Sequence, residues 1–163
     1  MLDQIYILPV LLFSVIIHEV AHGWMALMLG DPTARDRGRL TLNPIPHIDP
    51  IGSVLIPVLS LVASGRVFIA WAKPVPVNPS NFAHARRDDI LVSAVGPFAN
   101  LVLALCCTLA FILVSAIPPG ATEGAAWEGR RFLLKMFFGG ISLNIILAVF
   151  NLLPVPPLDG SHI

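Results

Sequence analysis

The sequence predicts an all-helical membrane protein that forms one domain over residues 1–163. Of its 163 residues, 56% are hydrophobic and only 12% are charged, a far more apolar balance than a soluble domain has. The apolar residues also gather into about four runs, and most charges lie between the runs, where the membrane surface is expected. The runs cover residues 5–29, 51–72, 90–117 and 132–153.

The composition also argues against several classes of protein. The formal net charge at pH 7 is zero, which gives no sign of a nucleic-acid partner. Cys106 and Cys107 are adjacent within an apolar run, and neighbouring cysteines rarely pair, so we expect no disulfide. The first residues lack a basic stretch and a small-residue cleavage site, so we expect no removable signal peptide.

The first apolar run, residues 5–29, is long enough to cross the ~30 Å hydrocarbon layer as a helix. It contains the pattern H-E-x-x-H, formed by His18, Glu19 and His22. In a helix the two histidines lie one turn apart on the same face, where their imidazoles can hold one zinc ion. Glu19 lies beside them and can act as a general base toward water.

The alternative is that both histidines pack against backbone carbonyls while Glu19 is protonated. An ionisable side chain at membrane depth costs about 2.5 kcal/mol or more, and such groups usually serve a function. Because a metal gives all three polar residues one common reason to be there, we favour the metal site.

The next two regions predict loops and a short apolar segment. Residues 39–43 alternate polar and apolar side chains, as a short strand or hairpin arm does. The run 51–72 is short for a clean crossing and contains Pro57, so it either crosses the bilayer or re-enters it. Residues 73–79, the proline segment, hold three prolines and cannot be helical, which predicts an extended loop or edge strand.

The charged residues 81–89 predict a surface turn, and the run 90–117 after them is long enough to cross the bilayer with tilt. Residues 121–131 predict a polar loop before the last run, 132–153. A proline-rich stretch follows that run and carries Asp159.

A catalytic zinc needs three protein ligands and one open position. Asp159 is the favoured third ligand, because unwound backbone at membrane depth is tolerated only where it lines a cavity or packs within protein. His162 is the fallback ligand. We expect His47 and His84 to be solvated, since both lie in polar loops.

Three motifs occur in a fixed order: H-E-V-A-H at 18–22, G-P-F-A-N at 96–100 and N-L-L-P-V-P-P-L-D-G at 151–160. In this order they resemble the site-2 protease family of intramembrane zinc metalloproteases. Residues 71–79 also resemble the small bacterial and archaeal members, which lack PDZ and CBS domains. The resemblance covers nearly the whole chain, and the two metal motifs together are highly specific.

The resemblance implies one zinc ion per chain, bound by His18, His22 and Asp159, with Glu19 as the general acid and base. Asn151 matches a family asparagine proposed to hold the substrate carbonyl or its oxyanion. By the same resemblance the chain is expected to cut transmembrane segments of other proteins, in regulated proteolysis within the cell membrane of a prokaryote. The oligomeric state and the membrane orientation stay open.

Asn100 matches the Gly-Pro-x-x-Asn position of the family, where we expect a role in helix packing or in support of the site. The family usually has a further span after the Leu-Asp-Gly motif, whereas three residues follow Gly160 here. We therefore expect the sequence to be truncated at its C-terminus.

One geometric requirement follows from these assignments. His18 and His22 lie past the midpoint of the first run, and Asp159 lies beyond the end of the last one. They meet most easily if the two runs are parallel. That arrangement requires either that residues 51–72 re-enter the membrane, or that the chain after residue 153 doubles back into it.

Two other functions compete with the protease. In a transporter or channel, the same ionisable residues would relay protons or metal ions, but they would then follow a continuous path rather than form two compact motifs. In a membrane scaffold the metal would be structural, and such a site prefers four ligands with no base beside them. Replacing Glu19 with Gln separates these functions, because only the protease loses turnover and keeps its zinc.

Overall fold

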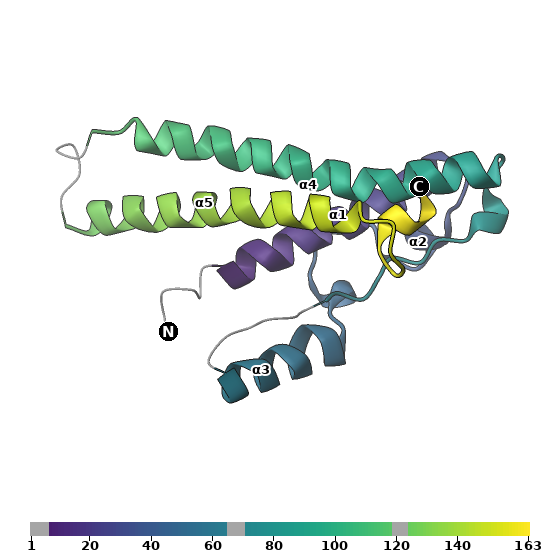
Figure 1. The fold of residues 1–163 in the computed structure, drawn as a ribbon, viewed down its shortest axis with the longest axis horizontal. Coiled ribbons are helices and arrows are strands. Elements are labelled where there is room, and N and C mark those ends of the chain that lie inside the picture. The colour runs from purple at the N-terminus through teal and green to yellow at the C-terminus, as the bar shows by residue number, and fades with distance from the viewer. Residues whose placement is uncertain (1–6, 65–70, 119–123) are drawn as a thin grey trace.

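The structure is a computed structural model that describes residues 7–64, 71–118 and 124–163. Its three long helices are α1 (Ile7–Met28), α4 (Ala85–Ser115) and α5 (Ala125–Asn151) (Figure 1). Each is long and apolar enough to cross a membrane. The described residues contain no strand, which confirms the all-helical fold.

The remaining described elements are short. They are α2 (Thr33–Asp36), η2 (Ile45–His47), η3 (Pro50–Leu55), α3 (Ile56–Ser64), η4 (Pro79–Asn81) and η6 (Asp159–His162).

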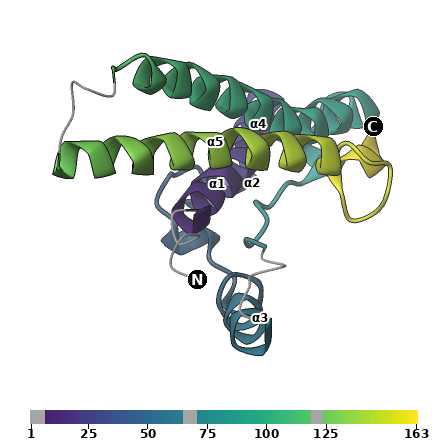
Figure 2. The same ribbon diagram turned by 60° about the vertical axis from the view of Figure 1, so that its left-hand side comes forward.

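The helices α4 and α5 lie side by side and antiparallel (Figures 1 and 2). The rings of Phe111 and Phe138 pack at a tilt of 51° with centroids 6.3 Å apart. One turn nearer the metal motifs, a Cβ on Gly140 would lie 2.8 Å from Cys107 Sγ. The absent side chain therefore lets the two backbones approach closely, which is how helices commonly pack in membranes.

The first helix, α1, crosses this pair and runs in the same direction as α5 (Figure 1). Asn144 of α5 is 1% exposed and donates to Ser14 Oγ of α1 at 2.9 Å. It also donates to the carbonyl of Gly140, one turn back in its own helix, at 2.9 Å. Parallel α1 and α5 provide the arrangement that the three predicted ligands require.

The connection between α1 and α4 leaves and returns at one end of the bundle. The N–H of Asn78 donates to Asp31 just after α1 at 2.7 Å, and Phe82 packs with Ala26 of α1 and Val92 of α4. The connection therefore makes no net crossing of the bundle.

Part of that connection stands away from the bundle. The π-helical turn η3 and the helix α3 lie to one side of the three long helices (Figures 1 and 2). Their six and nine residues together span about 22 Å at ~1.5 Å per residue, less than the ~30 Å of a full crossing. Residues 65–70 of the predicted run 51–72 lie outside the described residues.

The predicted strand or hairpin arm at 39–43 is wrong, because this region forms turns. Thr41 Oγ1 accepts from the N–H of Asn43 at 3.1 Å, and Asn43 Oδ1 accepts from the N–H of Ile45 at 3.1 Å. These side chains satisfy backbone donors that a strand partner would otherwise bind. The proline segment is non-helical over residues 73–78, as predicted, whereas Pro79 begins the 3-10 helix η4. No strand pairs with the segment among the described residues.

Two helix boundaries also differ from the prediction. Residues 85–89 were expected in a surface turn, but they form the first turns of α4. Asp88 is 4% exposed, and its carboxylate accepts from the N–H of His84 at 2.9 Å, which satisfies a donor at the helix start. Residues 125–131 are predicted as a loop but form the start of α5. There Arg131 Nη1 forms an ion pair with Glu128 Oε1, one turn earlier, at 3.5 Å.

Candidate metal centre

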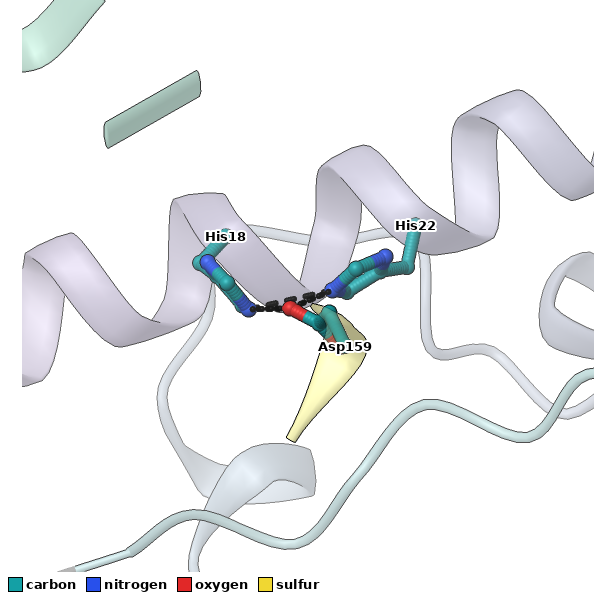
Figure 3. A group of neighbouring side chains, drawn as sticks. All are labelled: His18, His22 and Asp159. Carbon is teal, nitrogen blue, oxygen red and sulfur yellow. Dashed lines mark hydrogen bonds and ion pairs between the residues drawn. The ribbon is translucent and has the colours of Figure 1, made fainter. Parts of the chain in front are cut away.

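The helix α1 presents His18 and His22 on one face, one turn apart, and both are buried, at 6% and 8% exposed. Their Nε2 atoms lie 3.0 Å from each other. Asp159 Oδ2 approaches from the segment after α5 and lies 3.1 Å from His18 Nε2 and 3.3 Å from His22 Nε2 (Figure 3). Three potential ligand atoms from two distant parts of the chain therefore form one small triangle.

The second nitrogen of each ring, Nδ1, makes a hydrogen bond to a protein oxygen. His18 Nδ1 donates to Asn100 Oδ1 at 3.1 Å, and His22 Nδ1 donates to the carbonyl of Val92 at 2.7 Å. Because these oxygens only accept, each Nδ1 carries the proton and each Nε2 presents a lone pair. Neutral metal-binding histidines are usually oriented in this way by a carbonyl or carboxylate partner.

The triangle of acceptor atoms fits a metal ion. Asp159 Oδ2 is buried and makes no hydrogen bond of acceptable geometry, although both Nε2 atoms lie near it. Zinc bound at ~2.0–2.1 Å in tetrahedral geometry holds its ligand atoms about 3.3 Å apart. Three electron-rich atoms at 3.0–3.3 Å repel one another unless a cation lies between them. Two imidazoles and one carboxylate are also a donor set of catalytic zinc sites.

Asp159 reaches the histidines because the chain folds back tightly after α5. A Cβ on Gly160 would collide with the carbonyl groups of Leu152 and Leu153, so the turn needs a glycine.

Two residues of α4 complete the surroundings of the histidines. Gly96 lies against both rings, and a Cβ at this position would collide with the imidazoles of His18 and His22. Asn100 is fully buried, and its carbonyl fixes the ring of His18. The sequence singled out the Gly-Pro-x-x-Asn motif but did not show that its glycine makes room for the two imidazoles.

Glu19 is partly exposed beside this triangle. Its Oε2 accepts from the backbone N–H of Val75, in the proline segment, at 2.7 Å. A carboxylate next to a metal-binding triangle is suited to general acid–base catalysis.

Asn151 lies at the end of α5, where its Nδ2 donates to the carbonyl of Leu147 at 3.0 Å. Its predicted role toward the substrate carbonyl therefore stays a prediction. His162, the fallback ligand, pairs instead with Asp89 of α4 at 3.0 Å on the exposed side. His84 is exposed, as expected.

The prediction of a solvated His47 is wrong. The side chain is fully buried, and its Nε2 donates to the carbonyl of Thr41 at 2.9 Å. The ring is held by a backbone carbonyl six residues earlier, a contact that local polarity alone does not reveal.

The chain is similar to several curated proteins. It is 43% identical over 159 residues to "Putative zinc metalloprotease YwhC" of Bacillus subtilis, which covers 97% of this chain and 67% of that protein. It is 36% identical over 153 residues to "Putative zinc metalloprotease Rip2" of Mycolicibacterium smegmatis, which covers 91% of this chain and 52% of that protein. The chain thus spans about half to two thirds of the length of these relatives. No family model and no solved structure matches it.

Proposed function

The chain belongs to the site-2 protease family of zinc metalloproteases, and from this premise we propose that it cleaves a peptide bond in or near a transmembrane segment of another protein. One observation carries the proposal: potential ligand atoms of two histidines and one aspartate converge beside the carboxylate of Glu19. The two histidines and Glu19 lie on a helix long enough to span a membrane. We further propose that it works in the cell membrane of a prokaryote, as the bacterial relatives suggest.

In this proposal His18, His22 and Asp159 hold one zinc ion. Zinc in such a site polarises a carbonyl and lowers the pKa of water to ~7. Glu19 takes the proton of the attacking water and returns it to the leaving amine, a transfer worth about 100- to 10,000-fold in rate. The burial of the histidines excludes competing water from the ligands.

We propose that Asn151 stabilises the oxyanion, an interaction worth about 3 kcal/mol in comparable sites. To do so, its amide must exchange the carbonyl of Leu147 for the substrate. The substrate must also be unwound, because a helix shields its peptide bonds. Residues 40–42 or the proline segment would hold the unwound stretch by adding it as a strand.

The convergence of the ionisable residues at one point favours the protease over a proton or ion relay, which needs a series of groups along a path.

The test uses the full-length protein, purified in detergent, and a fluorogenic peptide with one apolar transmembrane segment interrupted by Asn-Gly. We expect the wild type to hold about one zinc per chain and to cleave the peptide. Asp159→Ala should lose the zinc. Glu19→Gln should keep the zinc but lose about 100- to 10,000-fold in kcat. Full zinc in Asp159→Ala would overturn the ligand assignment, and undiminished cleavage by Glu19→Gln would overturn the mechanism.

A further inference from the structure

The proline segment is held across α1 at both of its ends. At one end the N–H of Lys73 donates to the carbonyl of His47 at 2.9 Å, and the carbonyl of Lys73 accepts from Arg39 Nη2 at 2.6 Å. At the other end the N–H of Asn78 donates to Asp31 Oδ2 at 2.7 Å. Arg39 and Asp31 are both buried, at 7% and 0% exposed, so both anchors lie within packed protein.

Between these anchors, the segment offers few backbone donors. Residues 74 and 76 are prolines without an N–H group, so Val75 supplies the one N–H between them. That N–H is donated to Glu19 Oε2 at 2.7 Å, the one hydrogen bond that Glu19 makes among the described residues. The next N–H along the segment, that of Val77, makes no hydrogen bond within the described chain.

Gly23 lets the segment lie directly on α1. It follows Glu19 by one helical turn, so the two positions share one face of the helix. A Cβ on Gly23 would lie 2.9 Å from Val75 Cγ1 and 2.6 Å from Leu40 Cδ2, both closer than packed carbons tolerate. An alanine at this position would therefore push Val75 away from the helix.

We propose that the backbone N–H of Val75 is a positioning group for Glu19: it fixes Oε2 and so directs Oε1 toward the reacting water. A glutamate on a helix has three rotatable bonds, and holding it in one rotamer before the substrate arrives removes that ordering cost from the reaction. The prolines on both sides fix the extended backbone that presents the N–H. This inference rests on the proposed function, since it gives Glu19 the role of general base.

The hydrogen bond itself is tested without zinc and without substrate. The metal-free protein is labelled with ¹⁵N-valine, and the amide proton of Val75 is compared in the wild type and in Glu19→Ala. We expect the Val75 resonance to move upfield by more than that of any other valine. An unchanged Val75 resonance would overturn the proposal, whatever the protein does to peptides.

The effect on catalysis is tested with two matched proline substitutions. Val75→Pro removes the donated N–H, and Val77→Pro adds the same ring two residues later, where the N–H has no acceptor among the described residues. Both rings alter the segment proposed to hold the substrate, so KM should rise in both variants, while zinc content should be retained in both. Only Val75→Pro should also lower kcat, by about 100-fold, the effect of a misplaced catalytic group.

Gly23→Ala provides a second variant in case Val75→Pro does not fold. It keeps the N–H but displaces the segment, so kcat should fall while zinc content is retained. A folded, zinc-loaded Val75→Pro or Gly23→Ala with wild-type kcat would overturn the proposal. Failure of the proposed function has a different signature, because Glu19→Gln would then keep its activity while the Val75 resonance still responds to Glu19→Ala.

Discussion

The two ends of the helix bundle are built on opposite principles. At the end that carries His18, His22 and Asp159, here called the metal end, several buried side chains are polar and have specific partners, as His18 does with Asn100 and His22 with the carbonyl of Val92. Toward the other end, α4 and α5 pack through phenylalanines and a glycine, and they expose leucines such as Leu105 and Leu113. In the most apolar stretch of α1, 39% of the residues are buried within the protein. The corresponding share is only 11% in α4 and 17% in α5.

The comparison shows which contacts select one arrangement of the helices. In a bilayer, a lipid-exposed leucine has surroundings as apolar as those of a buried leucine, so apolar packing favours one helix arrangement only weakly over another. A buried polar group without a partner costs free energy, so each hydrogen bond at the metal end selects one arrangement. Substitutions at the metal end should therefore have large and specific effects, and those at the other end small ones.

The largest effect is expected for Gly96→Ala. The new methyl group collides with both imidazoles, so zinc affinity should fall by more than about 100-fold, beyond the loss from removing one supporting hydrogen bond. Gly129→Ala in α5 is the matched control, because a Cβ there meets nothing within 4 Å. Both are measured by zinc titration against a competing chelator. Equal affinity in the two variants would contradict the close approach of α4 to the histidines.

A smaller loss is expected for Asn100→Ala, which removes the acceptor that orients His18. Removal of such a partner typically lowers metal affinity by about 10- to 100-fold. Asn100→Asp keeps an acceptor at this position and should retain most of the affinity. The same chelator titration distinguishes them, and wild-type affinity in Asn100→Ala would show that the ring of His18 is held by packing alone.

The third effect concerns the anchor at Asp31 and depends on pH. Burial by itself would raise the pKa of Asp31, but hydrogen bonds from Asn78, Thr33 and Asn81 outweigh it and hold the pKa below its usual value. The carboxylate therefore stabilises the fold fully above the unfolded pKa of about 3.9, and this stabilisation is lost as pH falls through the lower, folded pKa.

Asp31→Asn removes that stabilisation. At pH 7 it should lower the free energy of unfolding by about 1.5–3 kcal/mol, the range for a hydrogen bond to a charged group. The measurement is the thermal unfolding midpoint in detergent from pH 7 to pH 3. The difference in Tm between Asp31→Asn and the wild type should become smaller toward pH 3. A Tm difference that is constant with pH would mean that the charge of Asp31 does not stabilise the fold.

The smallest effect is expected within the bundle, between Ser14 and Asn144. Their hydrogen bond is buried, yet side-chain hydrogen bonds between membrane helices average only about 0.6 kcal/mol. A double-mutant cycle with Ser14→Ala and Asn144→Ala should give a coupling near that value. Leu113→Ala, 72% exposed on α4, should change stability by less than about 0.5 kcal/mol. A coupling above about 2 kcal/mol would show that polar contacts also dominate this part of the bundle.

By itself the sequence determined the parts of the protein that depend on local spacing. Three of the four apolar runs correspond to the long helices α1, α4 and α5, and the spacing of His18 and His22 placed two potential ligands on one helix face. The motif around Asp159 indicated a third potential ligand, and the structure brings this carboxylate to the same point. These features depend on helix geometry and chain composition, which a single segment contains within itself.

The tertiary structure alone decided the contacts between segments far apart in the chain. It placed Gly96 and Asn100 against the histidines, joined Val75 to Glu19, and buried His47, which local polarity had assigned to solvent. It also replaced the predicted strand at 39–43 with turns. Such contacts depend on which helix faces meet, and hydrogen bonds across 56 to 82 residues leave no periodic signal in the sequence.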